Sequence, residues 1–181
     1  MTDCVALLRG INVGKSKRIA MADLRSLLEG LGHANVRTLL NSGNAVFEAK
    51  RGDAMALAKA IEKAIAGRFG FPVAVVVVTA TDLRSIVKEN RLRQADKDPS
   101  RFLVAFARPG ALGAAKALVA RSWAPDALAL GNKAAYLWCA SGLIESKLAK
   151  AFAKATGETA TTRNWATVLK LQAMLANAQA D

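Results

Sequence analysis

The fold of this chain is decided by residues 4–47, CVALLRGINVGKSKRIAMADLRSLLEGLGHANVRTLLNSGNAVF. Residues 4–9 are almost continuously apolar, as in a central strand that is buried on both faces. A glycine-bracketed basic loop follows over 10–18, and apolar residues at helical spacing then predict a helix over 21–31. Asn, Ser and Gly at 41–44 supply the local hydrogen bonds and positive φ of a turn, so a β-hairpin closes the stretch.

The next segments extend this stretch into a complete unit. Asp53 is a suitable N-cap for a helix whose apolar residues recur every four positions up to Phe69. Residues 72–80 contain four consecutive valines and form the clearest strand of the chain. The order is therefore β-α-β-β-α-β, the ferredoxin-like pattern, in which two helices cover one face of an antiparallel sheet.

The second half repeats this order in outline and ends differently. A short helix over 81–90 is followed by a polar segment, 91–100, which predicts a linker between subdomains 1–90 and 101–181. We expect a β-α-β-β-α-α unit that lacks its fourth strand, so the fold class is α+β, with antiparallel sheets covered by helices. Its expected elements are a strand (101–107), a helix (111–123), a hairpin (127–130 and 134–139), a helix (143–155) and a closing helix (162–178).

Composition is that of a globular protein with one or two small domains. The chain has 181 residues, 52% of them hydrophobic and 22% charged. The two cysteines, Cys4 and Cys139, lie far apart, and no His cluster accompanies them, so we expect reduced thiols, no metal and no cofactor. The N-terminus lacks signal-peptide features, and the longest apolar run, 71–80, is too short to cross a bilayer. We therefore expect a cytoplasmic protein that does not bind membranes.

The strongest compositional feature is the positive charge. The formal net charge is +12 and the isoelectric point is about 10.2. A field of that sign raises the local concentration of nucleic acids, nucleotides and other anions, although the same charge can serve solubility alone. The RNA-recognition version of the expected fold carries aromatic residues on its central strands. Residues 4–8 contain none, which argues against that kind of RNA module.

The loop after the first strand is the best candidate site. Residues 10–16, GINVGKS, resemble a P-loop, but three residues separate the glycines where the motif needs four, and the helix begins too late. A weaker hypothesis remains, because a glycine loop that enters a helix can present backbone N–H groups to an anion. Arg9, Lys15, Lys17 and Arg18 would add charge to that site. The alternative is a solvated basic loop whose glycines serve only the turn.

The last helix begins with a second candidate group. We expect Thr161 or Thr162 to be its N-cap. The following Arg163, Asn164 and Trp165 suggest recognition, since arginine binds phosphate or carboxylate and tryptophan stacks on rings. The alternative is structural, with the tryptophan in the core and the asparagine holding the entering loop. The single histidine and the scarce carboxylates form no catalytic constellation.

Short motifs near both ends of the chain carry a family resemblance. They are LLRGINVG at 7–14, MADL at 21–24, NSGNAVF at 41–47, SKL at 146–148, and ATTRNW at 160–165 with TVLKL at 167–171. These motifs resemble the bacterial domain-of-unknown-function-1697 family over almost the whole chain. The resemblance implies a small cytosolic α+β protein of two subdomains, and it supplies no established activity, ligand or catalytic residue.

The resemblance also implies a set of recurrent polar positions. They correspond here to Arg9, Asn12, Ser42, Asn44, Ser146, Lys147, Arg163 and Asn164. The chain departs from the family pattern at three places. Lys15 stands where a second loop glycine is common, Ala20 where proline is common, and Ala166 where a polar residue is common.

These observations lead to three functional hypotheses, in the following order. The first is a module that uses the glycine-rich basic loop to bind a phosphate-bearing anion, a nucleotide or a nucleic acid. The second is a homo-oligomeric structural or interaction protein whose open sheet edges pair two copies, and the third is an enzyme acting on a small phosphorylated substrate at the subdomain junction. The expected oligomeric state is a monomer or a homodimer. The candidate ligand-binding residues, expected to meet in one electropositive hollow, are Arg9, Asn12, Lys15, Lys17, Arg18, Ser42, Asn44, Ser146, Lys147, Arg163, Asn164 and Trp165.

Overall fold

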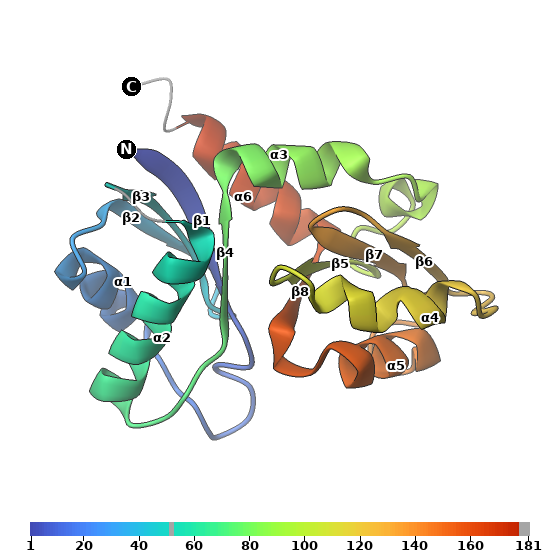
Figure 1. The fold of residues 1–181 in the computed structure, drawn as a ribbon, viewed down its shortest axis with the longest axis horizontal. Helices are drawn as coiled ribbons and strands as arrows, with labels where there is room; N and C mark the ends of the chain where they lie inside the picture. The colour runs from blue at the N-terminus through green and yellow to red at the C-terminus, as the bar shows by residue number, and fades with distance from the viewer. Residues whose placement is uncertain (51–52, 178–181) are drawn as a thin grey trace. The chain divides into compact units, whose positions relative to one another are not determined.

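The structure is a computed structural model that describes residues 1–50 and 53–177 (Figure 1). Contacts divide the chain into two compact units. The first unit contains Met1–Thr81 together with the chain from Leu171 onward, and the second contains Asp82–Lys170. This division differs from the expected subdomains 1–90 and 101–181. The helix after the fourth strand lies mostly in the second unit, and the end of the chain returns to the first.

The first unit has the expected β-α-β-β-α-β order. Its four strands form an antiparallel sheet in the order β2-β3-β1-β4, so β1 pairs with both β3 and β4. Placing β1 at the centre explains its continuous apolarity, because both of its faces are buried. The elements are β1 (Thr2–Leu8), α1 (Met21–Gly30), β2 (Ala34–Leu39), β3 (Asn44–Ala49), α2 (Ala54–Phe69) and β4 (Val75–Thr79).

The core of the first unit lies between its sheet and the helices α1 and α2, which cover one face of the sheet (Figure 1). Helix α2 begins at the predicted cap, because the Asp53 carboxylate accepts a hydrogen bond of 2.8 Å from the Ala56 N–H. It ends at Gly70, whose left-handed φ of 78° terminates a helix without steric cost. Both ends of this helix are therefore set by local sequence.

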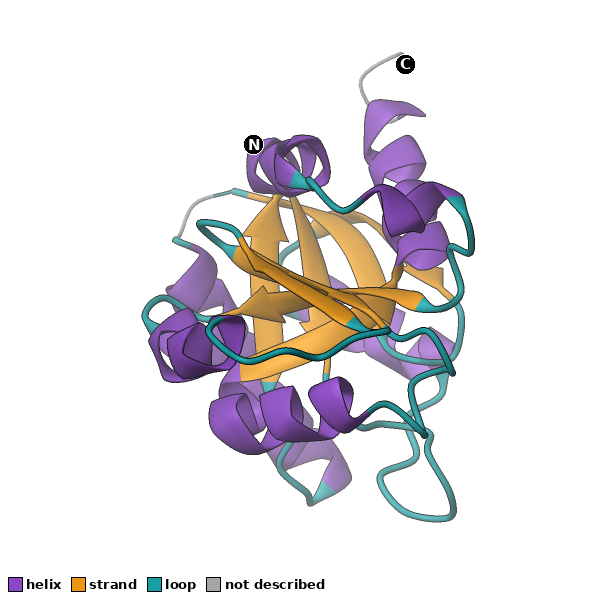
Figure 2. Cartoon of the chain, turned by 90° about the vertical axis from the view of Figure 1, so that its right-hand side faces the viewer, coloured by secondary structure: helices purple, strands orange, loops and turns teal. Residues whose placement is uncertain are grey.

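The second unit repeats the same sheet topology. Its antiparallel sheet has the order β6-β7-β5-β8, in which β5 occupies the central position that β1 has in the first unit. Figure 2 shows the strands of the sheets with helices packed against them. The elements from α3 onward are α3 (Ala80–Glu89), η1 (Arg93–Asp96), β5 (Phe102–Ala107), η2 (Ala111–Ala115), α4 (Lys116–Val119), β6 (Ala127–Leu130), β7 (Ala134–Trp138), α5 (Lys147–Thr156), η3 (Gly157–Thr159), β8 (Ala160–Asn164) and α6 (Trp165–Asn177), which passes into the first unit at Leu171.

The prediction of an α+β fold, with antiparallel sheets covered by helices, is confirmed. The prediction that the second unit lacks its fourth strand is wrong. Residues 160–164 form β8, which pairs with β5 along its length. Thr161 and Thr162 are β-branched, and the open edge of β5 offers them backbone partners, so strand pairing outweighs their capacity to cap a helix. The last helix begins at Trp165 instead of residue 162, and the predicted end at Ala178 lies outside the described residues.

Two predicted helices of the second unit also begin or end elsewhere. The expected helix at 111–123 is a 3-10 turn followed by the single turn α4, which ends at Val119. The expected helix at 143–155 begins only at Lys147, because the side chain of Ser146 is its N-cap and accepts from the Ala149 N–H at 2.9 Å. Leu118, Leu148 and Phe152 are buried as their apolar spacing predicts, whereas Val119 and Ile144, which were expected on the same faces, are 51% and 80% exposed.

Helix α3 is held to the second unit by polar contacts at the β6–β7 turn. The buried Tyr136 hydroxyl donates to the Ile86 carbonyl at 2.6 Å. The Glu89 carboxylate accepts from the backbone and the side chain of Asn132 at 3.1 and 2.8 Å. Burial, together with the charge of Glu89, raises the pKa of Tyr136, so the phenol stays a neutral donor.

Candidate functional site

The loop between β1 and α1 has an unusual backbone. Gly10 and Gly14 have a φ of 65°, and two residues with side chains, Asn12 and Lys17, have a φ of 56° and 52°. Left-handed backbone is costly for residues other than glycine and is tolerated best by asparagine. The loop therefore requires compensating contacts, and most of them come from one side chain.

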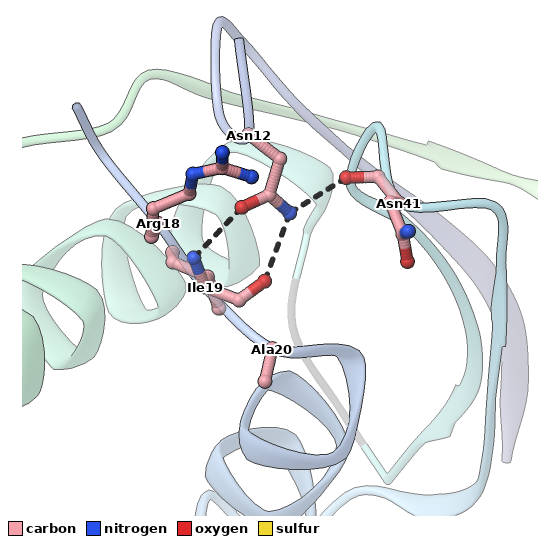
Figure 3. Close-up of a pocket in the computed structure, with 5 residues that line it drawn as sticks. All are labelled: Asn12, Arg18, Ile19, Ala20 and Asn41. Carbon is pink, nitrogen blue, oxygen red and sulfur yellow. Dashed lines mark hydrogen bonds between the residues drawn. The ribbon is translucent and has the colours of Figure 1, made fainter. Parts of the chain in front are cut away.

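The Asn12 carboxamide ties the loop together (Figure 3). Its Nδ2 donates to the Ile19 carbonyl at 2.9 Å and to the Asn41 carbonyl at 2.7 Å. Its Oδ1 accepts from the Ile19 N–H at 3.0 Å, and its own backbone N–H donates to the Lys17 carbonyl at 3.1 Å. Both amide hydrogens are used within the protein, so Asn12 positions the site and is not a free donor to a ligand.

Beside this clasp is an open pocket of about 370 Å³, lined by Asn12, Arg18, Ile19, Ala20 and Asn41. Figure 3 shows the Arg18 guanidinium extending beside the Asn12 carboxamide, with Ala20 at the start of α1. Ile19 is buried and forms an apolar wall, whereas Arg18 and Asn41 are exposed. The volume lies at the lower end of the range for small-molecule sites.

The N-terminus of α1 borders the same pocket through its N-cap residue, Ala20. Ala20 is the N-cap, and its methyl group cannot accept a hydrogen bond from the first N–H groups of the helix. Asp23, the acidic residue of the first turn, is paired instead with Arg68 at 2.8 Å. The partial positive charge of the α1 N-terminus is therefore left without a side-chain cap beside Arg18.

The β2–β3 turn borders the pocket through Asn41 and also contains Ser42 and Asn44. Asn44 is fully buried, and its Nδ2 donates to the Leu39 carbonyl at 2.8 Å and to the Ser42 hydroxyl at 3.0 Å. The Gly43 carbonyl accepts from the Leu8 N–H at 2.8 Å. These contacts close the turn against β1, so the predicted ligand residues Ser42 and Asn44 shape the site.

The other basic residues of the loop lie outside the pocket lining. Arg9 is half-buried at the end of β1, and its backbone N–H donates to the Ala74 carbonyl at 2.9 Å. Lys15 is exposed and Lys17 half-buried. Of the four basic loop residues predicted to bind an anion, Arg18 is therefore the one that lines this pocket.

In the second unit, Ser146 and Lys147 lie at the start of α5. The Ser146 hydroxyl caps the helix and donates to the Asp126 carboxylate at 2.7 Å, while the same carboxylate accepts from the Ala140 N–H at 2.8 Å. Burial raises the pKa of the neighbouring Cys139 thiol, which keeps it protonated. These contacts account for Ser146 as a structural residue, and Lys147 is exposed on the helix that it begins.

Arg163, Asn164 and Trp165 lie at the junction of β8 and α6. Arg163 is 8% exposed, and its Nη1 donates to the Thr161 hydroxyl at 2.9 Å and to the Thr162 carbonyl at 2.8 Å. Burial lowers the pKa of this guanidinium to about 10. The Asn164 Oδ1 accepts from the Thr167 N–H at 2.9 Å and caps α6, in place of the expected threonine cap.

Trp165 is 7% exposed and packs edge-on against Phe102, with ring centroids 5.5 Å apart. These contacts favour the structural interpretation of the group. Among the described residues, no cluster of three or more His, Cys, Asp or Glu side chains could hold a metal ion. Within the same residues, none of the helices combines the length and apolarity needed to cross a membrane.

The pocket includes residues that sequence reasoning did not select. Asn41, Ile19 and Ala20 line it, and the Asn41 turn was identified only as a hairpin. The position of Ile19 and Ala20 between the basic loop and the predicted helix could have identified them. Residues that join such a loop to a helix border any anion that the loop holds. The prediction that residues of both units share one hollow stays a prediction.

Comparison with known proteins identifies a family and a similar solved structure. The family model described as "Protein of unknown function (DUF1697)" matches residues 1–136. A conserved bacterial protein from Streptococcus pneumoniae has a similar structure, with a TM-score of 0.76 and 22% sequence identity, over 96% of this chain and 98% of that chain. At this identity the likeness concerns the fold alone. No curated protein matches the chain.

Proposed function

The chain belongs to the DUF1697 family of proteins of unknown function, and from its own residues we propose that the first unit binds a small phosphate-bearing anion, such as a nucleotide, in the pocket between the β1–α1 loop and α1. The observation that carries this proposal is the position of Arg18 in a pocket that also borders the uncapped N-terminus of α1. A guanidinium and free helix N–H groups both favour anions.

The clasp around Asn12 supports the proposal because it gives the pocket a defined shape before any ligand binds. Four hydrogen bonds hold the loop and join it to the β2–β3 turn. A preorganised loop loses little conformational entropy on binding, which favours affinity. The buried wall formed by Ile19 would exclude water from one side of the anion and strengthen its attraction to Arg18.

The test titrates the protein with inorganic phosphate and with ATP, and NMR of the backbone amides detects the binding. We expect the Met21 and Ala22 N–H resonances to shift on titration. Replacing Arg18 by glutamine should weaken binding about tenfold or more, because a charge-assisted hydrogen bond is lost. Lys15→Gln removes the same charge from an exposed position of the same loop and should change the affinity less than about twofold.

Two outcomes would overturn this assignment. Equal losses in Arg18→Gln and Lys15→Gln would mean that net charge, and not the pocket, governs binding. Ligand shifts confined to residues outside the loop and the first turn of α1 would place the anion elsewhere.

Two finer assignments accompany the proposed function. We assign each unit to the ferredoxin-like arrangement, which is supported by the matching strand orders β2-β3-β1-β4 and β6-β7-β5-β8. We also place the protein in the cytoplasm. This is supported by the two free cysteines, Cys4 and Cys139, both of which are buried as thiols.

A further inference from the structure

Helix α5 presents three lysines on the side that faces away from the core. Leu148 and Phe152 are buried in the core of the second unit, whereas Lys147, Lys150 and Lys154 are exposed. At 3.6 residues per turn the three lysines fall within an arc of about 60°, opposite the buried side chains, and their Cα atoms span about 10 Å along the axis. The helix thus carries a straight row of ammonium groups.

This row has no evident role in stabilising the helix. Among the described residues, none of the three lysines forms an ion pair. Lys147 lies in the first turn, and no acidic residue accompanies it there. A cation at the positive end of the helix dipole is unfavourable, so helix stability alone would place an acid at this position.

The neighbouring helical segments extend the positive surface. The turn η2 packs beside α5, and both η2 and α4 contribute to the same core cluster, on one side of the sheet (Figure 1). Segments 108–125 and 146–157 contain no aspartate or glutamate, and Lys116 and Arg121 are exposed there. We name Lys116, Arg121, Lys147, Lys150 and Lys154 the basic face.

The corresponding helices of the first unit have a different charge pattern. Helices α1 and α2 carry Asp23, Glu29 and Glu62 among their basic residues. The second unit, Asp82–Lys170, contains 15 basic and 7 acidic residues. The rest of the sequence contains 11 basic and 7 acidic residues. The excess positive charge is therefore concentrated in the second unit, where the basic face lies.

We propose that the basic face binds the phosphate backbone of double-stranded nucleic acid without reading its sequence. The lysine row spans about 10 Å, close to the rise of three base pairs at about 3.4 Å each, so its ammonium groups can reach successive phosphates of one strand. This surface lies in the other unit from the Arg18 pocket, so the proposal does not depend on the proposed function.

The side chains of the face favour a duplex over a single strand. Single-strand binding uses aromatic platforms on which bases stack. Phe152 on α5 is buried in the core. Trp123 follows Arg121 by two residues; its ring lies under the Arg121 guanidinium at 4.7 Å, and its indole N–H donates to the Leu118 carbonyl at 2.7 Å. Its ring and N–H are already engaged, so the face offers charge alone.

The same side chains disfavour a membrane surface as the partner. An interfacial helix inserts its apolar side into the bilayer, and in α5 that side, with Leu148 and Phe152, is buried in the core. Leu143 and Ile144 are exposed, but they lie in the loop before the helix. Backbone phosphates in a regular row therefore match the face better than lipid headgroups.

The experiment measures fluorescence polarisation of a labelled mixed-sequence DNA duplex with the full chain across a salt series. Replacing Lys147, Lys150 and Lys154 together by glutamine keeps the helix propensity and removes three charges. We expect the affinity at low salt to fall about tenfold or more, and the slope of log K against log salt to shrink in magnitude by about 2 to 3. A duplex of RNA should behave similarly, because the contacts are to phosphates.

The matched control removes three charges from the helices of the first unit through Arg25→Gln, Lys59→Gln and Lys63→Gln, all at exposed positions. This variant and Arg18→Gln should each keep duplex affinity within about threefold of the parent protein, since neither removes a charge of the basic face and exposed charges that contact no phosphate contribute little to affinity. Amide shifts of Lys147 and Lys150 on addition of the duplex provide a readout in the unmodified chain.

Several results would overturn the proposal. Equal losses in the two triple variants would show that net charge alone attracts the duplex. Binding to vesicles of phosphatidylserine but not to the duplex would make the face a membrane surface. Tighter binding to the single strand than to the duplex would also overturn the proposal, and so would the absence of duplex binding at low salt. If Arg18→Gln lost phosphate binding but bound the duplex as before, the proposal for the basic face would still hold.

Discussion

At the scale of single residues, residue type and residue role diverge in two polar side chains, the half-buried Asn12 and the buried Arg163. Asn12 and Arg163 are the kinds of residue that bind ligands, but here both donate their side-chain N–H groups to backbone carbonyls or, for Arg163, also to the Thr161 hydroxyl. An unsatisfied polar group inside a protein costs about 1–3 kcal/mol, so side chains that support a strained loop or a strand end are held by the protein itself. Arg18 is exposed, so its guanidinium can reach a ligand in the pocket.

His33 gives a prediction at this scale. Its Nε2 is buried and has no hydrogen-bond partner in the described part of the chain, and its ring packs on Phe47 with centroids 4.5 Å apart. Burial lowers its pKa below the ordinary 6.5. The unfolded chain therefore binds a proton that the folded chain does not, and the free energy of unfolding should fall as the pH drops from about 6.5 towards the folded pKa.

The measurement is an NMR titration of the single histidine, combined with urea unfolding at several pH values. His33→Phe keeps the ring contact with Phe47 and removes the titration, so the difference in pH dependence between the two proteins isolates the histidine. A titration midpoint at or above 6.5 would contradict the prediction.

At the scale of elements, the turns and caps decide where helices and strands stop. The β2–β3 turn is the clearest case. A Cβ at Gly43 would lie 2.7 Å from the Leu8 Cβ and 2.8 Å from the Ile11 Cδ1, and its φ is 81°. The turn is pressed onto β1 so closely that only glycine fits, and this close approach positions the Asn41 carbonyl that Asn12 binds.

Replacing Gly43 by alanine should therefore destabilise the first unit through both backbone strain and overlap. Gly32 is a matched control, because its φ is 84° and a Cβ there would meet nothing within 4 Å. We expect Gly32→Ala to cost about 1–2 kcal/mol from strain alone, and Gly43→Ala to cost about 1–3 kcal/mol more. Hydrogen exchange of the β1 amides measures the difference, and equal protection in the two variants would rule out the overlap.

At the scale of the whole molecule, the chain does not divide at one linker. Helix α6 belongs to the second unit up to Lys170 and to the first unit from Leu171 onward. Leu171 and Leu175 are buried, and the Arg37 Nη2 on β2 donates to the Met174 carbonyl at 2.8 Å. Residues Leu171, Met174 and Leu175 therefore complete the unit to which β1 and β2 belong.

This connection predicts that a change near the end of the chain destabilises the first unit. Leu175 is 3% exposed, and Leu175→Ala should cost about 2–4 kcal/mol, read as faster hydrogen exchange in β1 and β2. Leu169 lies on the same helix and is 41% exposed, so Leu169→Ala should cost less than about 1 kcal/mol. If exchange in β1 were equally fast in both variants, the helix end would not be part of the first unit.

Sequence reasoning located most elements and two of the residues that line the candidate pocket. The valine run of β4, the hairpins and the Asp53 cap were read correctly, because these signals depend on residues a few positions apart. Of the loop residues proposed for an anion, Asn12 and Arg18 do line the pocket. Asn41, which also lines it, was not selected, because its carbonyl meets Asn12 across 29 residues of sequence.

The sequence by itself determined the α+β class, the order of the elements in the first unit and the excess of positive charge, since apolar period, turn residues and charge are local or additive properties. Only the tertiary structure decided that residues 160–164 are a strand, that the last helix contributes to both units, and which loop cation borders the pocket. The physical reason is that strand pairing, burial and side-chain hydrogen bonds depend on partners that are distant in sequence and adjacent only after folding.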